Sequence, residues 1–290
     1  MPVVTVSGCA SHYTLDDFTD PWGPEPDVIL IQHGTVRNGR FWRPWVPRLS
    51  RVARVVRRDL IGHGESEDPG PDYRWSVDAL ADDLAAFLDA IDVAAVHYVG
   101  DSFGGVLGAC FGSRHPDRVK SLTLCSTPPH SPVGPVVKGD SERVVTAMGE
   151  LGAAGWAQML LDNGVLNANS PEQEEWVVRE AGRTPLHVIQ GIGEMLTPSD
   201  GSAPVDVMPL LPTLEMPVLF VAPPASPMLS LADQVAMRDA TPGAEIAVIP
   251  APGHEIYVTG TDRCIDAMLG FIGRRCPGAL GNCQISTTEA

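Results

Sequence analysis

The fold of this chain is decided by one stretch, His97-Tyr98-Val99-Gly100-Asp101-Ser102-Phe103-Gly104-Gly105. The β-branched residues before it predict a strand, and the residues from Phe103 to about His115 predict a helix. Between them lies the pattern G-x-S-x-G, centred on Ser102. In a sharp strand-to-helix turn, small flanking residues let the serine hydroxyl stand above the sheet, facing a helix N-terminus. The stretch therefore predicts a nucleophilic Ser102, and a glycine-rich turn without chemistry is the alternative.

Short β-branched runs alternate with amphipathic segments of helical length on both sides of this stretch. The clearest helix covers residues 77–91, with its apolar side chains on one face and Ser76 as the N-cap. This alternation predicts an α/β fold with a mostly parallel sheet that helices cover on both faces. The expected strands are Val28–Gln32, Arg54–Arg57, Val96–Val99, Ser121–Cys125, Val218–Val221 and Glu245–Ile249.

The alternation stops between residues 130 and 203. This segment has the pattern of several short helices, broken by glycine and proline, and its acidic residues outnumber its basic ones. We expect residues 1–129 and 204–290 to form one core, with residues 130–203 inserted as a helical lid. Its apolar residues either line a hydrophobic substrate site or only pack the lid; they are Trp156, Met159, Leu160, Leu161 and Trp176.

Composition excludes several classes of partner. The 290 residues carry a formal net charge of -16, which repels nucleic acid and anionic membranes. No apolar run reaches the length of a membrane span and no secretory signal is visible, so a cytoplasmic location and a small-molecule partner are expected. A homodimer is left open. One segment is basic, and we interpret it as a solvated face or, alternatively, an anion-attracting rim; its arginines are Arg37, Arg40, Arg43, Arg48, Arg51, Arg54, Arg57 and Arg58.

The six cysteines do not indicate a metal site. They are scattered, and none forms a C-x-x-C pair. Cys276 and Cys283 are close enough in sequence to bridge in the polar tail, but a reducing compartment argues against this. We therefore expect neither a metal nor a cofactor.

Four further segments resemble those of α/β-hydrolase fold enzymes and come in that family's order. They are similar to the strand-then-HG loop, the D-x-x-G-x-G-x-S turn, the P-x-R-V-x-x-L-x-L strand and the G-H motif. In this chain the segments are Ile31–Thr35, Asp59–Ser66, Asp117–Ser126 and Ile249–His254. Between Arg57 and Pro129 the chain is most similar to 3-oxoadipate enol-lactonases and related lactone or carbon–carbon bond hydrolases.

This resemblance implies roles for individual residues. Ser102 would attack a carbonyl carbon, while His254 would remove its proton and later return it to the leaving group. The backbone amides of Thr35 and Phe103 would form an oxyanion hole. His33 would shape the oxyanion loop rather than act as a second base, and His63 would brace the neighbouring turn.

The family's third catalytic group, an acid that orients the histidine, has no counterpart at either usual position. Those positions hold Ser126 and Ser226. Three explanations remain open: another carboxylate such as Asp233 reaches the histidine, a serine hydroxyl or a water orients it, or the chain has lost hydrolysis. Asp101 and Glu255 adjoin the nucleophile and the base, but side chains of neighbouring residues usually point apart, so we expect both to play structural roles.

The resemblance implies a cofactor-free serine hydrolase that cleaves a small, mostly apolar ester or lactone through an acyl-enzyme. The acidic lid argues against a strongly anionic substrate. One alternative is other chemistry on the same fold, namely carbon–carbon hydrolysis, lyase action or cofactor-free oxygenation. The second is a ligand-binding pseudo-enzyme, which the two vacant acid positions favour.

Overall fold

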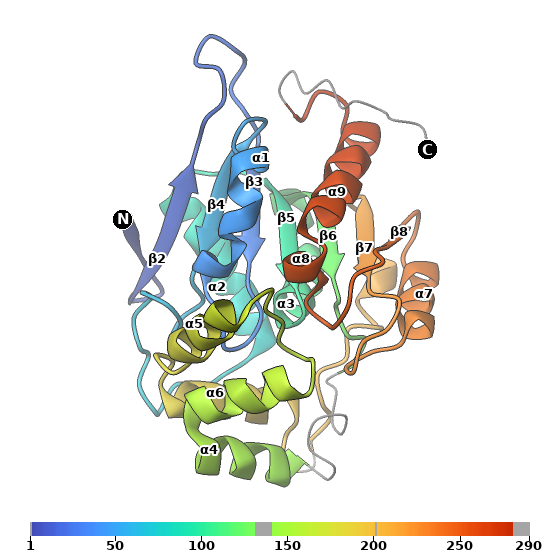
Figure 1. Ribbon diagram of the computed structural model, residues 1–290. Helices are drawn as coiled ribbons and strands as arrows, with labels where there is room; N and C mark the ends of the chain where they lie inside the picture. Colours follow the sequence, from blue (N-terminus) through green and yellow to red (C-terminus); the bar gives the residue numbers. More distant parts are fainter. Residues whose placement is uncertain (1, 131–140, 201, 281–290) are drawn as a thin grey trace.

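The computed structural model describes residues 2–130, 141–200 and 202–280. Within these ranges an eight-stranded sheet has the order β1-β2-β4-β3-β5-β6-β7-β8 (Figure 1). Neighbours from β4 to β8 are parallel, whereas β1 and β2 join this edge as antiparallel strands. The strands are β1 (Val3–Val6), β2 (Cys9–Asp16), β3 (Val28–Gln32), β4 (Arg54–Arg58), β5 (Val96–Asp101), β6 (Val119–Cys125), β7 (Val218–Ala222) and β8 (Glu245–Val248).

Helices cover both faces of the sheet (Figure 1). Helices α2 and α3 share one hydrophobic core with the sheet, and α9 and η1 share the other. The α-helices are α1 (Val46–Leu49), α2 (Val77–Ala90), α3 (Phe103–Arg114), α4 (Ser141–Asp162), α5 (Pro171–Ala181), α6 (Leu186–Leu196), α7 (Leu231–Ala240), α8 (Ile256–Thr259) and α9 (Thr261–Arg275). The 3₁₀ helices are η1 (Gly39–Trp45), η2 (Pro116–Arg118) and η3 (Leu211–Thr213).

The alternation of side chains along each strand creates the two cores. In β3, Ile29 and Ile31 belong to the core under α9, whereas Val28 and Leu30 belong to the core under α2 and α3. All five residues of β3 are buried. A strand covered on both faces has a continuous apolar sequence, which is why this strand could be predicted from sequence.

The sequence predicted the central elements within a few residues, but it missed one edge of the sheet. The expected strands and the two expected helices are all present, and Ser76 caps α2 by accepting a hydrogen bond from the N–H of Ala79. Strands β1 and β2 were not predicted. Strand β1 is β-branched but only four residues long and partly exposed, and β2 lacks the apolar run or regular alternation that signals a strand.

The segment between β6 and β7 contains the helices α4, α5 and α6, which lie together at one end of the sheet (Figure 1). Helix α4 is interrupted at Gly152, whose φ of 67° is not helical. A lid function for residues 130–203 stays a prediction, and residues 131–140 and 201 lie outside the described residues. Cys283 does too, so the structure does not test its pairing with Cys276. Among the described residues, no helix is both long and apolar enough to span a membrane.

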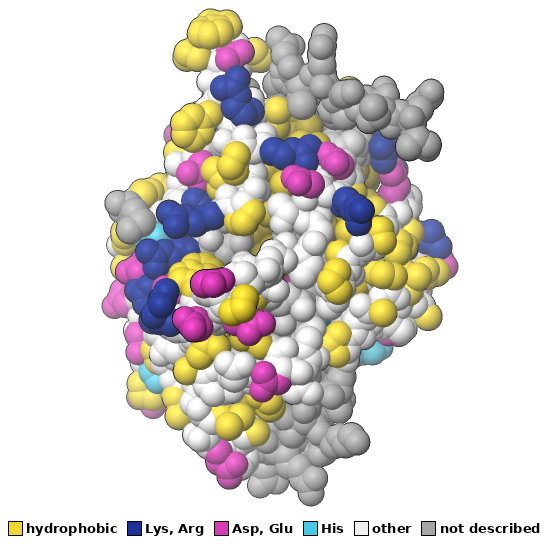
Figure 2. Space-filling view, in the orientation of Figure 1, with side chains coloured by type: hydrophobic (Ala, Val, Ile, Leu, Met, Phe, Trp, Pro, Cys, Tyr) yellow, Lys and Arg dark blue, Asp and Glu magenta, His cyan; other side chains and the backbone are white. Residues whose placement is uncertain are grey.

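The arginine-rich segment is not the uniformly solvated face that we expected. Arg37 and Arg58 are only 2% and 1% exposed, and they form ion pairs with Glu255 and Asp83. A buried guanidinium needs a nearby carboxylate, and these partners cannot be inferred from the local spacing of the arginines. The exposed basic side chains lie beside acidic ones on the face that Figure 2 shows.

Candidate active site

Ser102 occupies a strained turn at the end of β5. Strand β5 ends at Asp101 and helix α3 begins at Phe103, which leaves Ser102 between them with φ 52° and ψ −116°. Positive φ is uncommon for a residue with a side chain and persists where the surroundings impose it. Here the N–H of Ser102 donates to the carbonyl of Cys125 at 2.9 Å. The turn therefore places the Ser102 hydroxyl at the carboxyl end of the central strands.

Two glycines after Ser102 allow the close packing that this turn requires. A Cβ atom on Gly104 would lie 2.4 Å from the carbonyl oxygen of Gln32, and one on Gly105 would lie 1.8 Å from Oγ1 of Thr127. Both distances are far below van der Waals contact, so neither position accepts a side chain without movement. The glycines let α3 begin directly against the ends of its neighbours.

His254 lies on the loop between β8 and α8 and faces Ser102. Its Nε2 is 3.0 Å from the Ser102 Oγ, and the residue is 1% exposed. Burial lowers the pKa of His254 to about 4, so the ring is neutral at neutral pH. A neutral imidazole carries a lone pair on one nitrogen, and in the tautomer that leaves Nε2 unprotonated it can accept the hydroxyl proton.

The other nitrogen of the ring, Nδ1, lies 3.0 Å from the hydroxyl oxygen of Ser226. This oxygen also accepts a hydrogen bond from the N–H of Met228 at 3.1 Å. Ser126 contacts the backbone of the histidine instead, because its hydroxyl donates to the His254 carbonyl at 2.5 Å. Of the two serines at the family's acid positions, only Ser226 touches the ring.

The suggestion that Asp233 reaches His254 is wrong. The Asp233 carboxylate accepts hydrogen bonds of 2.8 Å from both the N–H and the hydroxyl of Ser230. The Ser230 hydroxyl accepts in turn from the Asp233 N–H, which completes a capping box at the start of α7. The Asp233 carboxylate therefore caps the start of α7 and does not contact His254.

The predicted oxyanion loop lies directly beside Ser102. A Cβ atom on Gly34 would be 3.2 Å from the Asp101 carbonyl and 3.5 Å from Cβ of Ser102. Within the described part of the chain, neither the Thr35 N–H nor the Phe103 N–H takes part in a hydrogen bond. Both donors are therefore free to bind a ligand, and their catalytic role stays a prediction.

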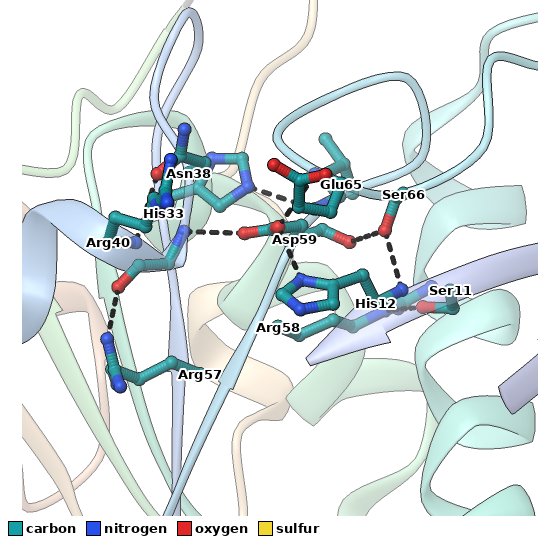
Figure 3. A network of polar contacts seen from close by, with 12 residues as sticks. Ser11, His12, His33, Asn38, Arg40, Arg57, Arg58, Asp59, Glu65 and Ser66 are labelled. Carbon is teal, nitrogen blue, oxygen red and sulfur yellow. Dashed lines mark hydrogen bonds and ion pairs between the residues drawn. The ribbon is translucent and has the colours of Figure 1, made fainter. Parts of the chain in front are cut away.

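His33 and Asp59 stabilise the predicted oxyanion loop through hydrogen bonds. Nε2 of His33 accepts the Leu60 N–H at 2.9 Å, so its Nδ1–H donates to the Gly34 carbonyl at 2.7 Å. Burial lowers the pKa of His33. Asp59 accepts the Gly39 N–H at 2.7 Å, at the centre of the network in Figure 3. Both ring nitrogens of His33 are engaged in structural contacts, which leaves neither free to act as a second base.

His63 reaches the site from the turn after β4. Its Nδ1–H donates to the Ile61 carbonyl at 3.1 Å, in keeping with a bracing role. Burial, with a smaller effect from His33, lowers the pKa of His63 to about 3. Its Nε2 has no hydrogen-bond partner within the described ranges.

Two buried carboxyl groups adjoin Ser102 and His254. Glu255 accepts from Nε of Arg37 at 2.8 Å and from the Asn167 N–H at 2.6 Å, so one side chain joins the oxyanion loop, the histidine loop and the α4–α5 connection. Burial raises the pKa of Asp101 well above its usual value, and Glu255 adds to the effect. Sequence reasoning missed Arg37 and Asn167 as supports of the site, because no local pattern connects residues so distant in the chain.

Ser102 and His254 both line a cavity whose remaining wall is mostly apolar. Its empty volume is about 940 Å³, which includes solvent at its mouth. Of the apolar residues predicted for the inserted segment, Trp156 and Leu160 line this cavity, whereas Trp176 packs on Phe41 with ring centroids 4.4 Å apart. The apolar wall comes from Val144, Met148, Ile189, Ile192, Leu196 and Met228, among others.

Several known proteins that are similar to this chain are hydrolases. The family model of the alpha/beta hydrolase fold matches residues 27–146. A putative carbamate hydrolase, RutD, of Caulobacter sp. (strain K31) is 26% identical across 86% of this chain and 92% of its own length. The 2-hydroxymuconate semialdehyde hydrolase of Pseudomonas sp. (strain CF600) is 33% identical over 33% of this chain and 35% of its own.

Solved structures share the fold over nearly the whole chain. The enol-lactonase from Burkholderia xenovorans LB400 superposes with a TM-score of 0.78 at 24% identity, covering 93% of this chain and 99% of that one. The family match includes the predicted oxyanion loop and the turn at Ser102. The chain therefore has the α/β-hydrolase fold.

Proposed function

We propose that this protein is a serine hydrolase that cleaves a small, mostly apolar ester or lactone through an acyl-enzyme on Ser102. The observation that carries the proposal is the 3.0 Å contact between Ser102 Oγ and His254 Nε2 at the wall of an apolar cavity. A nucleophile and a base within hydrogen-bond reach are the signature of covalent catalysis.

In this mechanism Ser102 Oγ attacks the carbonyl carbon while His254 Nε2 takes its proton. The Thr35 and Phe103 N–H groups stabilise the oxyanion, and loss of one such donor costs about 3–4 kcal/mol in comparable sites. His254 then protonates the leaving oxygen, which departs and leaves the acyl group on Ser102. A water molecule, deprotonated by the same nitrogen, releases the acid and restores the serine.

The walls of the cavity favour a neutral, apolar substrate. Met148, Trp156 and Leu160 supply apolar surface, whereas Asp101 and Glu255 bring carboxyl groups to the polar end. Among the described residues no lysine or arginine lines this cavity, so an additional carboxylate on the substrate would find no cation there. The chemistry needs no cofactor, and we keep the cytoplasmic location as an expectation.

Two observations favour alternative functions. The local similarity to 2-hydroxymuconate semialdehyde hydrolase makes carbon–carbon bond hydrolysis with the same two residues the second candidate. Ser226, in place of an acid at His254 Nδ1, favours a pseudo-enzyme that binds its ligand without turnover.

Covalent labelling with a fluorophosphonate, measured by intact mass, tests the proposal. We expect one adduct on the wild type and none on Ser102→Ala, since only an activated serine reacts. The absence of an adduct on folded wild-type protein would refute the proposal and favour the ligand-binding alternative. If labelling succeeds, comparing turnover of neutral esters, lactones and carbon–carbon cleavage substrates separates the two enzymatic candidates.

A further inference from the structure

We propose that Ser226 is the positioning residue of this site. Its hydroxyl oxygen accepts the Nδ1–H of His254 and thereby directs the Nε2 lone pair at Ser102. The inference rests on the proposed function, because it concerns the base of the same reaction. It assigns to a neutral hydroxyl the orienting role that a carboxylate has in the Ser-His-Asp arrangement.

The loop between β7 and α7 holds the Ser226 hydroxyl in place. The Met228 N–H donates to Ser226 Oγ at 3.1 Å, an i to i+2 contact typical of serine turns. Pro227 fixes its own φ and restricts the backbone of Ser226 to extended conformations. The hydroxyl is therefore oriented toward the ring by the backbone rather than by the histidine alone.

Two hydrogen-bond arrangements between Ser226 and His254 are possible, and only one leaves Nε2 able to accept a proton. A serine hydroxyl has one hydrogen and two lone pairs, and Met228 occupies one lone pair. If the second accepts Nδ1–H, the Nε2 of His254 is unprotonated and can take the Ser102 proton. If the Ser226 hydroxyl donates to Nδ1 instead, Nε2 carries the hydrogen and cannot act as a base. A carboxylate would permit only the first arrangement, whereas Ser226 permits both.

No carboxylate in the described part of the chain competes for this position. Asp233 caps α7, and Glu255 is held by Arg37. The Asp101 carboxyl group makes no hydrogen bond with the described residues, and it does not contribute to the pKa shift of His254. Burial alone lowers the pKa of His254 to about 4, without an opposing contribution from a negative neighbour. The imidazolium formed during the reaction therefore has only the Ser226 dipole to stabilise it on the Nδ1 side.

Four variants separate this role from a structural one. Ser226→Ala removes the hydroxyl, Ser226→Thr retains it, and Ser226→Asp supplies a carboxylate. Ser230→Ala is the matched control, because Ser230 lies on the same loop but bonds Asp233 rather than the histidine. The readouts are the rate of fluorophosphonate labelling from pH 4 to 9 and the ¹⁵N shifts of the His254 ring, which report its tautomer.

We expect Ser226→Ala to label at least about 10-fold more slowly, as loss of an orienting partner reduces general-base catalysis. Ser226→Thr should regain most of that rate, and Ser230→Ala should match the wild type. Ser226→Asp should move the acid limb of the pH profile upward by more than about one unit, because a carboxylate raises the pKa of the ring. The ¹⁵N shifts should show Nδ1–H in the wild type and a shift toward Nε2–H in Ser226→Ala.

Two results would overturn the inference: wild-type protein with Nε2–H as the dominant tautomer, or Ser226→Ala with both the labelling rate and the tautomer of the wild type. Failure of the proposed function has a different signature. In that case the wild type does not label, while the ring still loses its Nδ1–H tautomer in Ser226→Ala.

Discussion

Replacing Arg37 with methionine should leave a buried carboxylate without its cation. Arg37 and Glu255 are each 2% exposed, and the guanidinium contacts the carboxylate through Nε at 2.8 Å and through Nη2. The same guanidinium lies 4.2 Å from the ring centroid of Phe41. Methionine retains most of the apolar stem, so the main loss is the charge.

The burial of this ion pair determines how much stability the Arg37→Met variant should lose. Removing one partner of a buried ion pair costs about 3–5 kcal/mol, because the remaining charge has neither water nor a counter-ion. A domain's whole free energy of unfolding is about 5–15 kcal/mol, so the loss should be evident. The exposed pair between Arg48 and Asp266 is the matched control. Exposed pairs contribute about 0–1 kcal/mol.

Urea unfolding at pH 7 measures the difference. We expect Arg37→Met to lower the free energy of unfolding by about 3–5 kcal/mol and Arg48→Ala to lower it by less than about 1 kcal/mol. The double variant Arg37→Met with Glu255→Gln should be more stable than Arg37→Met alone. A neutral glutamine needs no cation, and its oxygen can still accept the Asn167 N–H.

Two outcomes would refute this reasoning. One is an Arg37→Met loss as small as that of Arg48→Ala, which would mean that the pair is solvated. The other is a double variant that is no more stable than Arg37→Met alone, which would mean that the Glu255 charge is not the cause of the loss.

Two more predictions concern the histidines and the turn. His254 and His63 have pKa values lowered by burial from 6.5 to about 4 and about 3. The unfolded chain therefore takes up protons first, and between pH 7 and 5 stability should fall by roughly 2 kcal/mol for each histidine. His63→Gln should show a shallower pH slope in urea unfolding, and an unchanged slope would contradict its burial. Gly105→Ala should lower the melting temperature, because the added methyl group would overpack against Thr127 at a cost of about 1–3 kcal/mol or more. Gly270→Ala is the control and should not lower it, since a Cβ atom there would lie 3.4 Å from its nearest neighbour. Equal melting temperatures for the two variants would count against the close approach of Gly105 to Thr127.

The sequence by itself determined the central sheet and the turn that carries Ser102. Both depend on local properties: the apolar run of a strand buried on two faces, the period of α2, and glycines where backbones approach closely. These signals are complete within a few residues of the chain. The position of Ser226, where the family usually has an acid, came instead from the resemblance to α/β-hydrolases and not from these local signals.

Only the tertiary structure decided which groups meet at the site. It showed that Ser226 rather than Asp233 contacts the histidine ring, and that Arg37 pairs with Glu255 instead of facing solvent. It also added the antiparallel strands β1 and β2 at the edge. Such contacts depend on which loops come together when the sheet forms. A buried charge is stable only beside a partner, and that partner can lie at any separation along the chain. Local spacing does not encode that choice.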